Sequence, residues 1–335
     1  MLKHFYPISL ERIADMLCEK KKTLIIFHVR PDADAVGSAF ALRELLRIMD
    51  VPVYCACSDE VPERLQFLCD GTQGSVLIDD DFALDYERVV SVDSASPSQL
   101  GSLYVRLHKD VDLMIDHHAF GTPYANNYID PDAAATGEII YELAKILKAK
   151  GRIAEIPERT LNCIFAAISS DTGGFRFSNT TPRIMRIAAE LMEKGVDVAA
   201  LSSLLYDSKP LTQLRAEGAA IERVRIYENG KIASVLFPFE LKQKLGAASE
   251  HLDSLIDIAR SICGVEVAFV VKQMECGGPC RISIRSTGNV DVAEICALFG
   301  GGGHRCAAGC TLNVDCVEDA EGQILEVLFR KMNNN

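Results

Sequence analysis

The most informative stretch of the chain, residues 23–38, reads Thr-Leu-Ile-Ile-Phe-His-Val-Arg-Pro-Asp-Ala-Asp-Ala-Val-Gly-Ser. Its first five residues form an apolar run typical of a buried strand, and this run stops at His28. Asp32 and Asp34 follow, and then apolar residues at helical spacing predict a helix over residues 38–49. A buried strand that leads through histidine and aspartates into a helix predicts an α/β domain with polar groups at the carboxyl edge of its sheet.

The rest of the first 180 residues repeats this alternation of strands and helices. Three further runs are predicted to be strands: residues 51–57, 89–92 and 111–115. Residues 137–148 have the spacing of a helix with Thr136 as its N-cap, whereas the apolar run 162–169 fits the end of a strand or of a helix. Strands that alternate with helices predict an α/β fold with a mostly parallel, doubly wound sheet.

The pattern changes after residue 182. Residues 182–220 are helical in spacing and more polar. Beyond them lie three predicted strands (231–237, 265–272 and 281–285), two predicted helices (251–263 and 291–299) and a glycine-rich loop (300–303). We therefore expect a first domain over residues 1–185, a helical linker over 186–220 and a smaller α/β domain over 221–332.

The composition limits the class of partner. Among 335 residues, 47 acidic and 35 basic side chains give a formal charge of −12, which argues against long nucleic acids and anionic membranes as partners. No run approaches the ~20 apolar residues of a membrane span, and the first residues lack the features of a secretory signal. The twelve scattered cysteines therefore fit free thiols in a reducing cytoplasm better than disulfides or a zinc site.

Aspartates and histidines gather directly after four of the apolar runs. They are His28, Asp32 and Asp34 after the first, Asp93 after 89–92, Asp116, His117 and His118 after 111–115, and Asp171 after 162–169. A single aspartate at such a place often does no more than cap a helix or form a turn. Ligands of open parallel sheets bind at the carboxyl ends of the strands, so four such clusters predict one shared site at that edge.

The residue types in this predicted site indicate divalent cations. Carboxylates and imidazoles without thiolates favour Mn²⁺ or Mg²⁺. Five or six potential ligands are too many for one tetrahedral ion and suit two ions that share a bridging carboxylate. Two such ions stabilise both the attacking and the leaving oxygen of a phosphoryl displacement. The sequence therefore predicts a two-metal hydrolase of phosphate esters or phosphoanhydrides.

These motifs resemble those of the DHH phosphoesterase superfamily. The resemblance is carried by His28-x-x-Pro31-Asp32-x-Asp34-x-x-Gly37-Ser38, Asp93, Asp116-His117-His118 and Asp171. The string Gly-Gly-Gly-Gly-His-Arg-Cys-Ala-Ala-Gly over residues 300–309 resembles the signature of the DHHA1 domain. Length and layout are most similar to the branch of nano-RNases (oligoribonucleases) and 3′-phosphoadenosine 5′-phosphate phosphatases. The resemblance implies a DHH catalytic domain followed by a DHHA1 substrate-binding domain.

The resemblance also implies a role for each site residue. One metal ion would be held by His28, Asp32 and Asp93, and a second by Asp34, Asp93, His117 and Asp171, so that Asp93 bridges the two. Asp116 would orient an imidazole, and His118 would lie beside the substrate phosphate as a proton donor or a stabiliser of charge. The resemblance favours Mn²⁺ as the cation, with Mg²⁺ as the alternative.

The second domain concentrates a few cations. Alternate residues of a strand share a face, so Arg281 and Arg285 are expected to point the same way. A glycine run lets main-chain N–H groups approach a phosphate, although it is more often a simple turn. The resemblance implies that this domain binds the nucleotide across an interdomain cleft through Arg285, His304, Gly302, Gly303 and, as a weaker candidate, Arg281.

The function that we expect from these features is hydrolysis of phosphate esters in very short oligonucleotides or single nucleotides. We expect a Mn²⁺-dependent phosphodiesterase that converts very short oligoribonucleotides to 5′-mononucleotides, with 3′-phosphoadenosine 5′-phosphate as a second candidate substrate. Two alternatives stay open: a hydrolase of another small phosphate, such as pyrophosphate or a linear or cyclic dinucleotide, and a non-catalytic nucleotide-binding protein. We expect a cytoplasmic protein with neither a long nucleic acid nor a membrane as partner, and a homodimer is left open.

Overall fold

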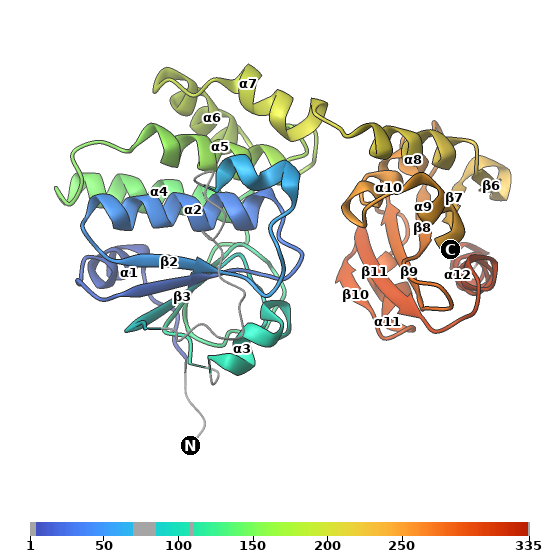
Figure 1. Ribbon diagram of the computed structural model, residues 1–335, viewed down its shortest axis with the longest axis horizontal. Coiled ribbons are helices and arrows are strands. Elements are labelled where there is room, and N and C mark those ends of the chain that lie inside the picture. The colour runs from blue at the N-terminus through green and yellow to red at the C-terminus, as the bar shows by residue number, and fades with distance from the viewer. Residues whose placement is uncertain (1–4, 70–84, 108–109, 334–335) are drawn as a thin grey trace. The chain divides into compact units, whose positions relative to one another are not determined.

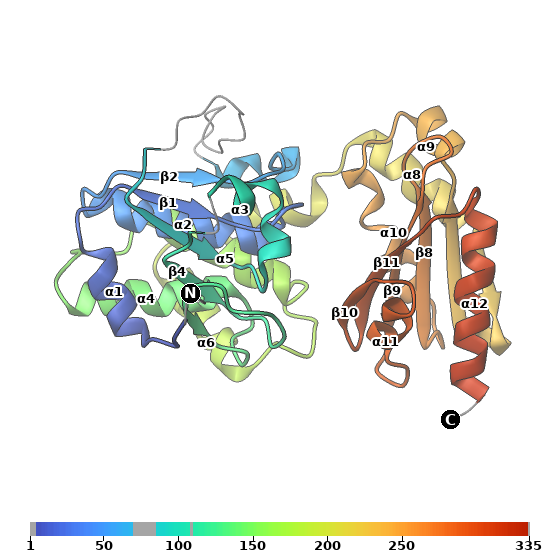
Figure 2. The same ribbon diagram turned by 90° about the horizontal axis from the view of Figure 1, so that it is seen from below.

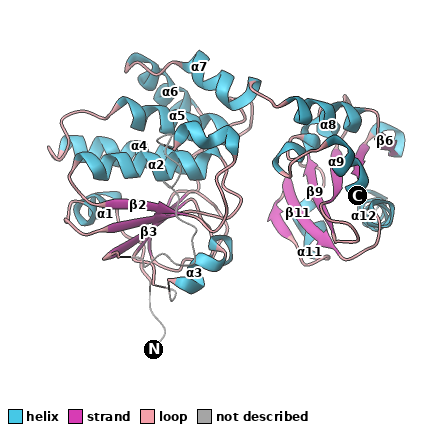
Figure 3. Cartoon of the chain, viewed as in Figure 1, coloured by secondary structure: helices cyan, strands magenta, loops and turns pink. Residues whose placement is uncertain are grey.

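The computed structural model describes residues 5–69, 85–107 and 110–333. The chain divides into two compact units, Met1–Ser208 and Lys209–Asn335. Each unit has its own sheet and its own helices (Figure 1; Figure 3). Both units are therefore α/β, the class that the sequence predicts.

The first unit is built on a sheet of five strands. In chain order they are β1 Thr23–Ile26, β2 Val53–Ala56, β3 Arg88–Val92, β4 Leu113–Asp116 and β5 Asn126–Ile129. Their order in the sheet is β2-β1-β3-β4-β5, and each neighbouring pair is parallel. Strands β1 to β4 match the predicted runs, whereas β5 opens with two asparagines and lacks the apolar signal.

Helices cover both faces of this sheet. They are α1 Leu10–Leu17, α2 Ala33–Ile48, α3 Ser102–Arg106, α4 Thr136–Ala149, α5 Glu158–Asp171, α6 Pro182–Glu193 and α7 Val198–Ser202, with shorter turns η1 Glu63–Leu68, η2 Pro97–Leu100 and η3 Ser203–Asp207. One core lies between the sheet and α1, α2 and α4, with α5 packed on α2 and α4; another lies between the opposite face and α3 (Figure 1). This arrangement confirms the doubly wound sheet.

Helix α2 begins earlier than the sequence predicts. It starts at Ala33 rather than at residue 38, because Asp32 acts as its N-cap. Asp32 Oδ1 accepts hydrogen bonds from the main-chain N–H groups of Asp34 and Ala35, both at 3.0 Å. This cap satisfies donors that a helix start otherwise leaves unpaired, and it brings Asp34 into the first turn of the helix.

One other local prediction needs correction, and one that the sequence left open is resolved. Thr136 is the first residue of α4, and Ala135 occupies the N-cap position. The ambiguous run 162–169 is helical and lies within α5, so Asp171 ends a helix rather than a strand. When every residue of a run is buried, its apolar pattern has no period that would distinguish a helix from a strand.

Close packing of three helices brings their polar residues together. A Cβ atom on Gly37 of α2 would lie 2.5 Å from the carbonyl oxygen of Cys163, and one on Gly137 of α4 would lie 2.4 Å from Ala167 Cβ. Both contacts are with α5. Glycine at these two positions therefore lets α2 and α4 approach α5 closely, which places Asp34 and Thr136 near the end of α5 at Asp171.

The second unit contains a mixed sheet of six strands. They are β6 Val224–Tyr227, β7 Ile232–Phe237, β8 Val267–Gln273, β9 Cys280–Ser286, β10 Gly302–His304 and β11 Ala307–Leu312, and the sheet order is β10-β11-β9-β8-β7-β6. The pair β7–β8 is parallel, and the other pairs are antiparallel. The three predicted strands correspond to β7, β8 and β9.

Helices also cover both faces of the second sheet. They are α8 Leu211–Ile221, α9 Phe239–Leu245, α10 Leu255–Arg260, α11 Val292–Ala297 and α12 Val317–Asn333, with short turns η4 Glu228–Gly230 and η5 Glu250–Leu252. Buried residues of α11 and α12 form a core on one face, and those of α8 and α10 form a core on the other. Figure 2 shows α12 running alongside the strands.

The glycine-rich stretch is only partly a loop. Gly302 and Gly303 belong to β10, which pairs with β11. A Cβ atom on Gly301 would lie 2.2 Å from the carbonyl oxygen of Gly309, and one on Gly303 would lie 2.5 Å from that of Ala307. Close contact between main chains therefore requires glycine at these positions, whatever else the stretch binds.

Residues 186–220 are helical, as the sequence predicts, and they contribute to both units. Ile187 and Leu191 of α6 and Leu201 of α7 are buried in the core of the first unit. Ala216 and Ala220 of α8 are buried in the core of the second. Across the described part of the chain, none of the helices combines the length and apolar character that crossing a bilayer requires.

Candidate active site

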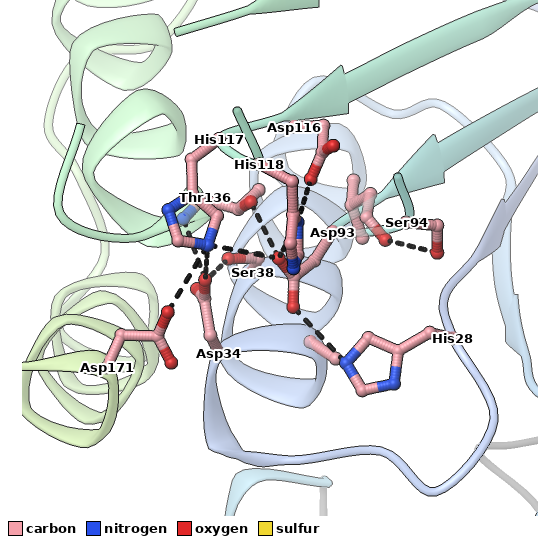
Figure 4. A network of polar contacts seen from close by, with 12 residues as sticks. His28, Asp34, Ser38, Asp93, Ser94, Asp116, His117, His118, Thr136 and Asp171 are labelled. Atoms are coloured by element: carbon pink, nitrogen blue, oxygen red, sulfur yellow. Dashed lines mark hydrogen bonds and ion pairs between the residues drawn. The ribbon is translucent and has the colours of Figure 1, made fainter. Parts of the chain in front are cut away.

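The predicted site lies where the direction of the sheet's connections changes. From β1 the chain passes through α2 to β2, which lies on one side of β1. From β3 it passes through α3 to β4, which lies on the opposite side of the β1–β3 pair. Open sheets of this order leave a crevice beyond the carboxyl ends of these two strands. His28 follows β1 and Asp93 follows β3, and the structure places His28 Nε2 3.4 Å from Asp93 Oδ2 (Figure 4).

A first group of potential ligands consists of His28, Asp32 and Asp93. Besides its contact with Asp93, His28 Nε2 lies 3.7 Å from Asp32 Oδ1. The other ring nitrogen of His28, Nδ1, is 2.8 Å from the carbonyl oxygen of Val29. A carbonyl accepts only from a protonated nitrogen, so this contact places a proton on Nδ1 and makes Nε2, which faces the two carboxylates, the nitrogen that would bind a cation.

A second group consists of Asp34, His117 and Asp171. His117 Nε2 lies 3.7 Å from Asp34 Oδ2 and 3.3 Å from Asp171 Oδ2 (Figure 4). Its Nδ1 is 3.3 Å from the carbonyl oxygen of Ala133, so the same tautomer argument applies to this ring. The three residues come from α2, the loop after β4 and the end of α5.

Asp93 lies between the two groups. Its Oδ2 faces His28, whereas its Oδ1 lies 3.7 Å from His117 Nε2. The residue has a positive φ of 53°, and its N–H donates to the carbonyl oxygen of Ile115 at 3.0 Å. Aspartate tolerates this left-handed conformation better than most residues, and such backbone strain is concentrated at functional sites. One buried carboxylate therefore faces both groups.

The amino-terminal turn of α4 holds two of the carboxylates. Asp34 accepts from the main-chain N–H of Thr136 at 2.7 Å and of Gly137 at 2.9 Å, and from Ser38 Oγ at 2.9 Å. The Thr136 hydroxyl donates to Asp93 Oδ1 at 2.9 Å. Sequence reasoning treats Thr136 only as a cap, since nothing in the local pattern indicates a partner 43 positions away.

His118 forms a third group of potential ligands with Asp93 and His117, and it also contacts Asp116. His118 Nδ1 lies 2.7 Å from Asp116 Oδ1, and Asp116 is buried. Asp116 Oδ2 is also buried and has no hydrogen-bond partner within the residues that the structure describes. His118 Nδ1 lies 3.8 Å from Asp93 Oδ1, so this pair adjoins the shared carboxylate. An imidazole held this way at one nitrogen can present its other nitrogen to a substrate.

The electrostatics of the site favour bound cations. Burial and the nearby charges of Asp93 and Asp171 raise the pKa of Asp34 well above its usual range, and burial raises the pKa of Asp171 to about 6. Although burial opposes a charge on His117, its contact with Asp171 and the other carboxylates raise its pKa to about 11. Buried carboxylates that repel one another around imidazoles are the donor set of Mn²⁺ and Mg²⁺ sites.

The two candidate arginines of the second unit, Arg281 and Arg285, both lie on β9. Cys280, Ile282 and Ile284 are buried in the core, whereas Arg281 and Arg285 alternate with them on the opposite face, which confirms that the two arginines share a face. Arg281 is exposed and Arg285 is half-buried.

Arg285 has no counter-ion among the described residues. Its Nη1 donates to the carbonyl oxygen of Ile284 at 3.0 Å, and no carboxylate of the described chain lies within ion-pair distance of it. Arg285 pairs with Ala307 on β11, and Ala307 pairs with His304 on β10, so the three are in register across the sheet. The side chain of His304 lies outside the described part of the structure.

Comparison with known proteins identifies the family. The family model described as "DHH family, N-terminal domain" matches residues 22–168, and that of the DHHA1 domain matches residues 229–334. A bifunctional oligoribonuclease and PAP phosphatase, NrnA, from Thermus thermophilus is 30% identical over 309 residues, which cover 92% of this chain and 89% of the relative. The chain belongs to the DHH family. It is a phosphoesterase that also carries a DHHA1 domain.

Two solved structures of similar fold bear on the DHH architecture. An exopolyphosphatase-related protein from Bacteroides fragilis has a TM-score of 0.84 and 22% identity, and the match covers 95% of each chain. RecJ from Thermus thermophilus in complex with Mn²⁺ has a TM-score of 0.56 and 14% identity, over 98% of this chain and 56% of RecJ. At these identities the likeness concerns the fold.

Proposed function

We propose that this DHH-family protein hydrolyses very short oligoribonucleotides to 5′-mononucleotides with two divalent cations, Mn²⁺ in preference to Mg²⁺. The observation that carries the proposal is Asp93, a buried carboxylate whose two oxygens face two separate groups of His and Asp side chains. The name of the Thermus thermophilus relative supports the substrate class. That name also supports 3′-phosphoadenosine 5′-phosphate as a second substrate.

The two groups supply the ligands. His28, Asp32 and Asp93 would hold one cation, and Asp34, Asp93, His117 and Asp171 would hold the other. Bound there, the cations would polarise the phosphate and lower the pKa of a water molecule. The main-chain carbonyl groups of Val29 and Ala133 bind Nδ1 of the two imidazoles and would leave Nε2 as the nitrogen that binds a cation once its proton is displaced.

His118 would act on the leaving group. Asp116 holds its Nδ1 and stabilises a positive charge on the ring, an arrangement that would leave Nε2 to face the substrate phosphate. From that nitrogen His118 would donate a proton to the leaving oxygen or stabilise its charge. The buried carboxylate of Asp116 acts through His118 and keeps this imidazole oriented.

The second unit would bind the nucleotide. A half-buried guanidinium without a counter-ion among the described residues suits a phosphate, because its planar fork binds two oxygens at once. Arg285 is therefore the first candidate, followed by His304 with the glycine main chain, and Arg281 is weaker because it is exposed. A formal charge of −12 with so small a group of cations favours short, multiply charged substrates over long strands.

The twelve free cysteines favour the reducing cytoplasm as the place of this activity.

A hydrolysis panel tests the proposal. Purified protein with Mn²⁺ would be given RNA of two to five nucleotides, a long single strand, 3′-phosphoadenosine 5′-phosphate, a cyclic dinucleotide and pyrophosphate, with Asp93→Ala as the control. We expect the short RNAs to be cleaved fastest, with mononucleotides as products, and no turnover by the variant. Fast cleavage of pyrophosphate alone, or turnover that survives the loss of Asp93, would overturn the proposal.

A further inference from the structure

Thr136 is buried and contacts two of the residues assigned above to the metal site. Its main-chain N–H donates to Asp34 Oδ2 at 2.7 Å, and its hydroxyl donates to Asp93 Oδ1 at 2.9 Å (Figure 4). We propose that the Thr136 hydroxyl is a positioning group, which fixes the orientation of the Asp93 carboxylate and thereby sets the affinity of the protein for divalent cations. This inference rests on the proposed function, because it assumes that Asp93 binds both cations.

The contact with the Thr136 hydroxyl is the shortest that the Asp93 carboxylate makes with the side chains of the surrounding site residues. Thr136 Oγ1 lies 2.9 Å from Asp93 Oδ1, whereas the imidazole nitrogens of His28, His117 and His118 lie 3.4, 3.7 and 3.8 Å from one or other oxygen. The terminal torsion of an aspartate is broad, so a carboxylate without a short hydrogen bond rotates easily. A donor on one oxygen restricts that rotation and keeps the other oxygen directed towards His28.

The contact leaves room for a cation on the same oxygen. A carboxylate oxygen has two lone pairs, and the hydroxyl uses one of those on Oδ1. The second lone pair remains for a cation on the side of His117, and Oδ2 remains for a cation on the side of His28. The hydroxyl therefore orients a bridging carboxylate without blocking either of its binding directions.

The same turn of α4 and the loop before it position other ligands through the main chain alone. The N–H groups of Thr136 and Gly137 bind Asp34, and the carbonyl group of Ala133 binds His117. None of these contacts uses the side chain at position 136. A substitution there therefore isolates the effect of the hydroxyl on Asp93.

The test compares Thr136→Val with two other variants of the full chain. Valine keeps the shape of threonine and removes the hydroxyl, whereas Thr136→Ser keeps the hydroxyl. The matched control is Thr160→Val in α5, because Thr160 is equally buried and its hydroxyl has no partner among the described residues. Mn²⁺ is titrated into each metal-free protein by calorimetry, and free Mn²⁺ is counted independently by electron paramagnetic resonance.

We expect Thr136→Val to bind Mn²⁺ about 10- to 100-fold more weakly, which is the usual effect of removing a hydrogen bond to a metal ligand. Thr136→Ser and Thr160→Val should bind like the unaltered protein. Equal affinity in Thr136→Val and the unaltered protein would overturn the inference and leave the proposed function standing. Absence of Mn²⁺ binding by the unaltered protein would overturn both. If Thr136→Val fails to fold, Thr136→Ala replaces it in the titration. We expect the same loss of Mn²⁺ affinity in that variant, and an unchanged affinity would again overturn the inference.

Discussion

His28 Nε2 and Asp93 Oδ2 lie 3.4 Å apart, although their residues are far apart in the sequence. The contact joins the carboxyl ends of β1 and β3, which are neighbours in the sheet. It therefore places a histidine and a shared carboxylate where a doubly wound sheet leaves a crevice.

Asp93→Asn should abolish the activity without disturbing the backbone. Asparagine tolerates the positive φ of this position as aspartate does, so the substitution removes the charge and adds no strain. A charged bridging ligand should stabilise the transition state by several kcal/mol. Its loss should therefore lower kcat/KM about 10³-fold or more. Steady-state kinetics on a dinucleotide would measure this, with circular dichroism as the control for folding. A loss of about tenfold or less would contradict the bridging role.

Divalent cations should stabilise the fold of the first unit. Removing them leaves buried carboxylates that repel one another, as the raised pKa values of Asp34 and Asp171 indicate. A ligand at about 100 times its Kd that binds only the folded state adds about 2.7 kcal/mol. We expect the melting temperature to rise by several degrees when Mn²⁺ is added to chelator-treated protein, and not to rise in Asp93→Asn. Calorimetric scans in both conditions provide the measurement.

Asp116→Asn should slow turnover and leave metal binding intact. Asp116 contacts His118 at 2.7 Å, and none of the three groups of potential ligands among the described residues includes it. Loss of a well-oriented acid–base group costs about 10²- to 10⁴-fold, so we expect kcat to fall by about 10² or more with KM little changed. Mn²⁺ affinity, measured in parallel, should stay at its original value. A parallel loss of metal affinity would show that Asp116 is itself a ligand.

Arg285→Ala should weaken substrate binding more than Arg281→Ala. The two arginines share a face of β9, but Arg285 is half-buried with no counter-ion among the described residues, and Arg281 is exposed. A hydrogen bond to a charged group is worth about 1.5–3 kcal/mol, so KM for a dinucleotide should rise about 10- to 100-fold in Arg285→Ala. Arg281→Ala serves as the matched control. Equal effects of the two substitutions would contradict the assignment.

Arg88→Met should destabilise the first unit and leave the chemistry unchanged. The buried guanidinium of Arg88 donates to Thr23 Oγ1 at 2.7 and 3.0 Å and to the carbonyl oxygen of Met16 at the end of α1. Its removal leaves buried acceptors unpaired, at a cost of about 2–4 kcal/mol in the free energy of unfolding. Urea denaturation would measure the loss. Arg12→Met, the same change on the exposed side of α1, should cost less than about 0.5 kcal/mol.

The sequence by itself determined the elements that carry the site. Apolar runs of strand length followed by helical spacing are local patterns, so the amino-acid order alone is enough to place β1 to β4, α4 and most of α2, but not the first turn of α2 or the helix that ends at Asp171. The position of His28, Asp93 and Asp116–His118 directly after those runs then predicted a shared edge, because parallel strands end on the same side of a sheet. The family motifs added the expected roles of these residues.

Only the tertiary structure decided how these residues are held. Thr136 reaches Asp34 across 102 positions and Asp93 across 43, and the close approach of α2 and α4 to α5 depends on Gly37 and Gly137. Such contacts join segments that are distant along the chain, and they leave no period or spacing that a sequence pattern could show. The sequence therefore predicts which residues gather at the sheet edge, whereas the packing of the helices decides which atoms face one another.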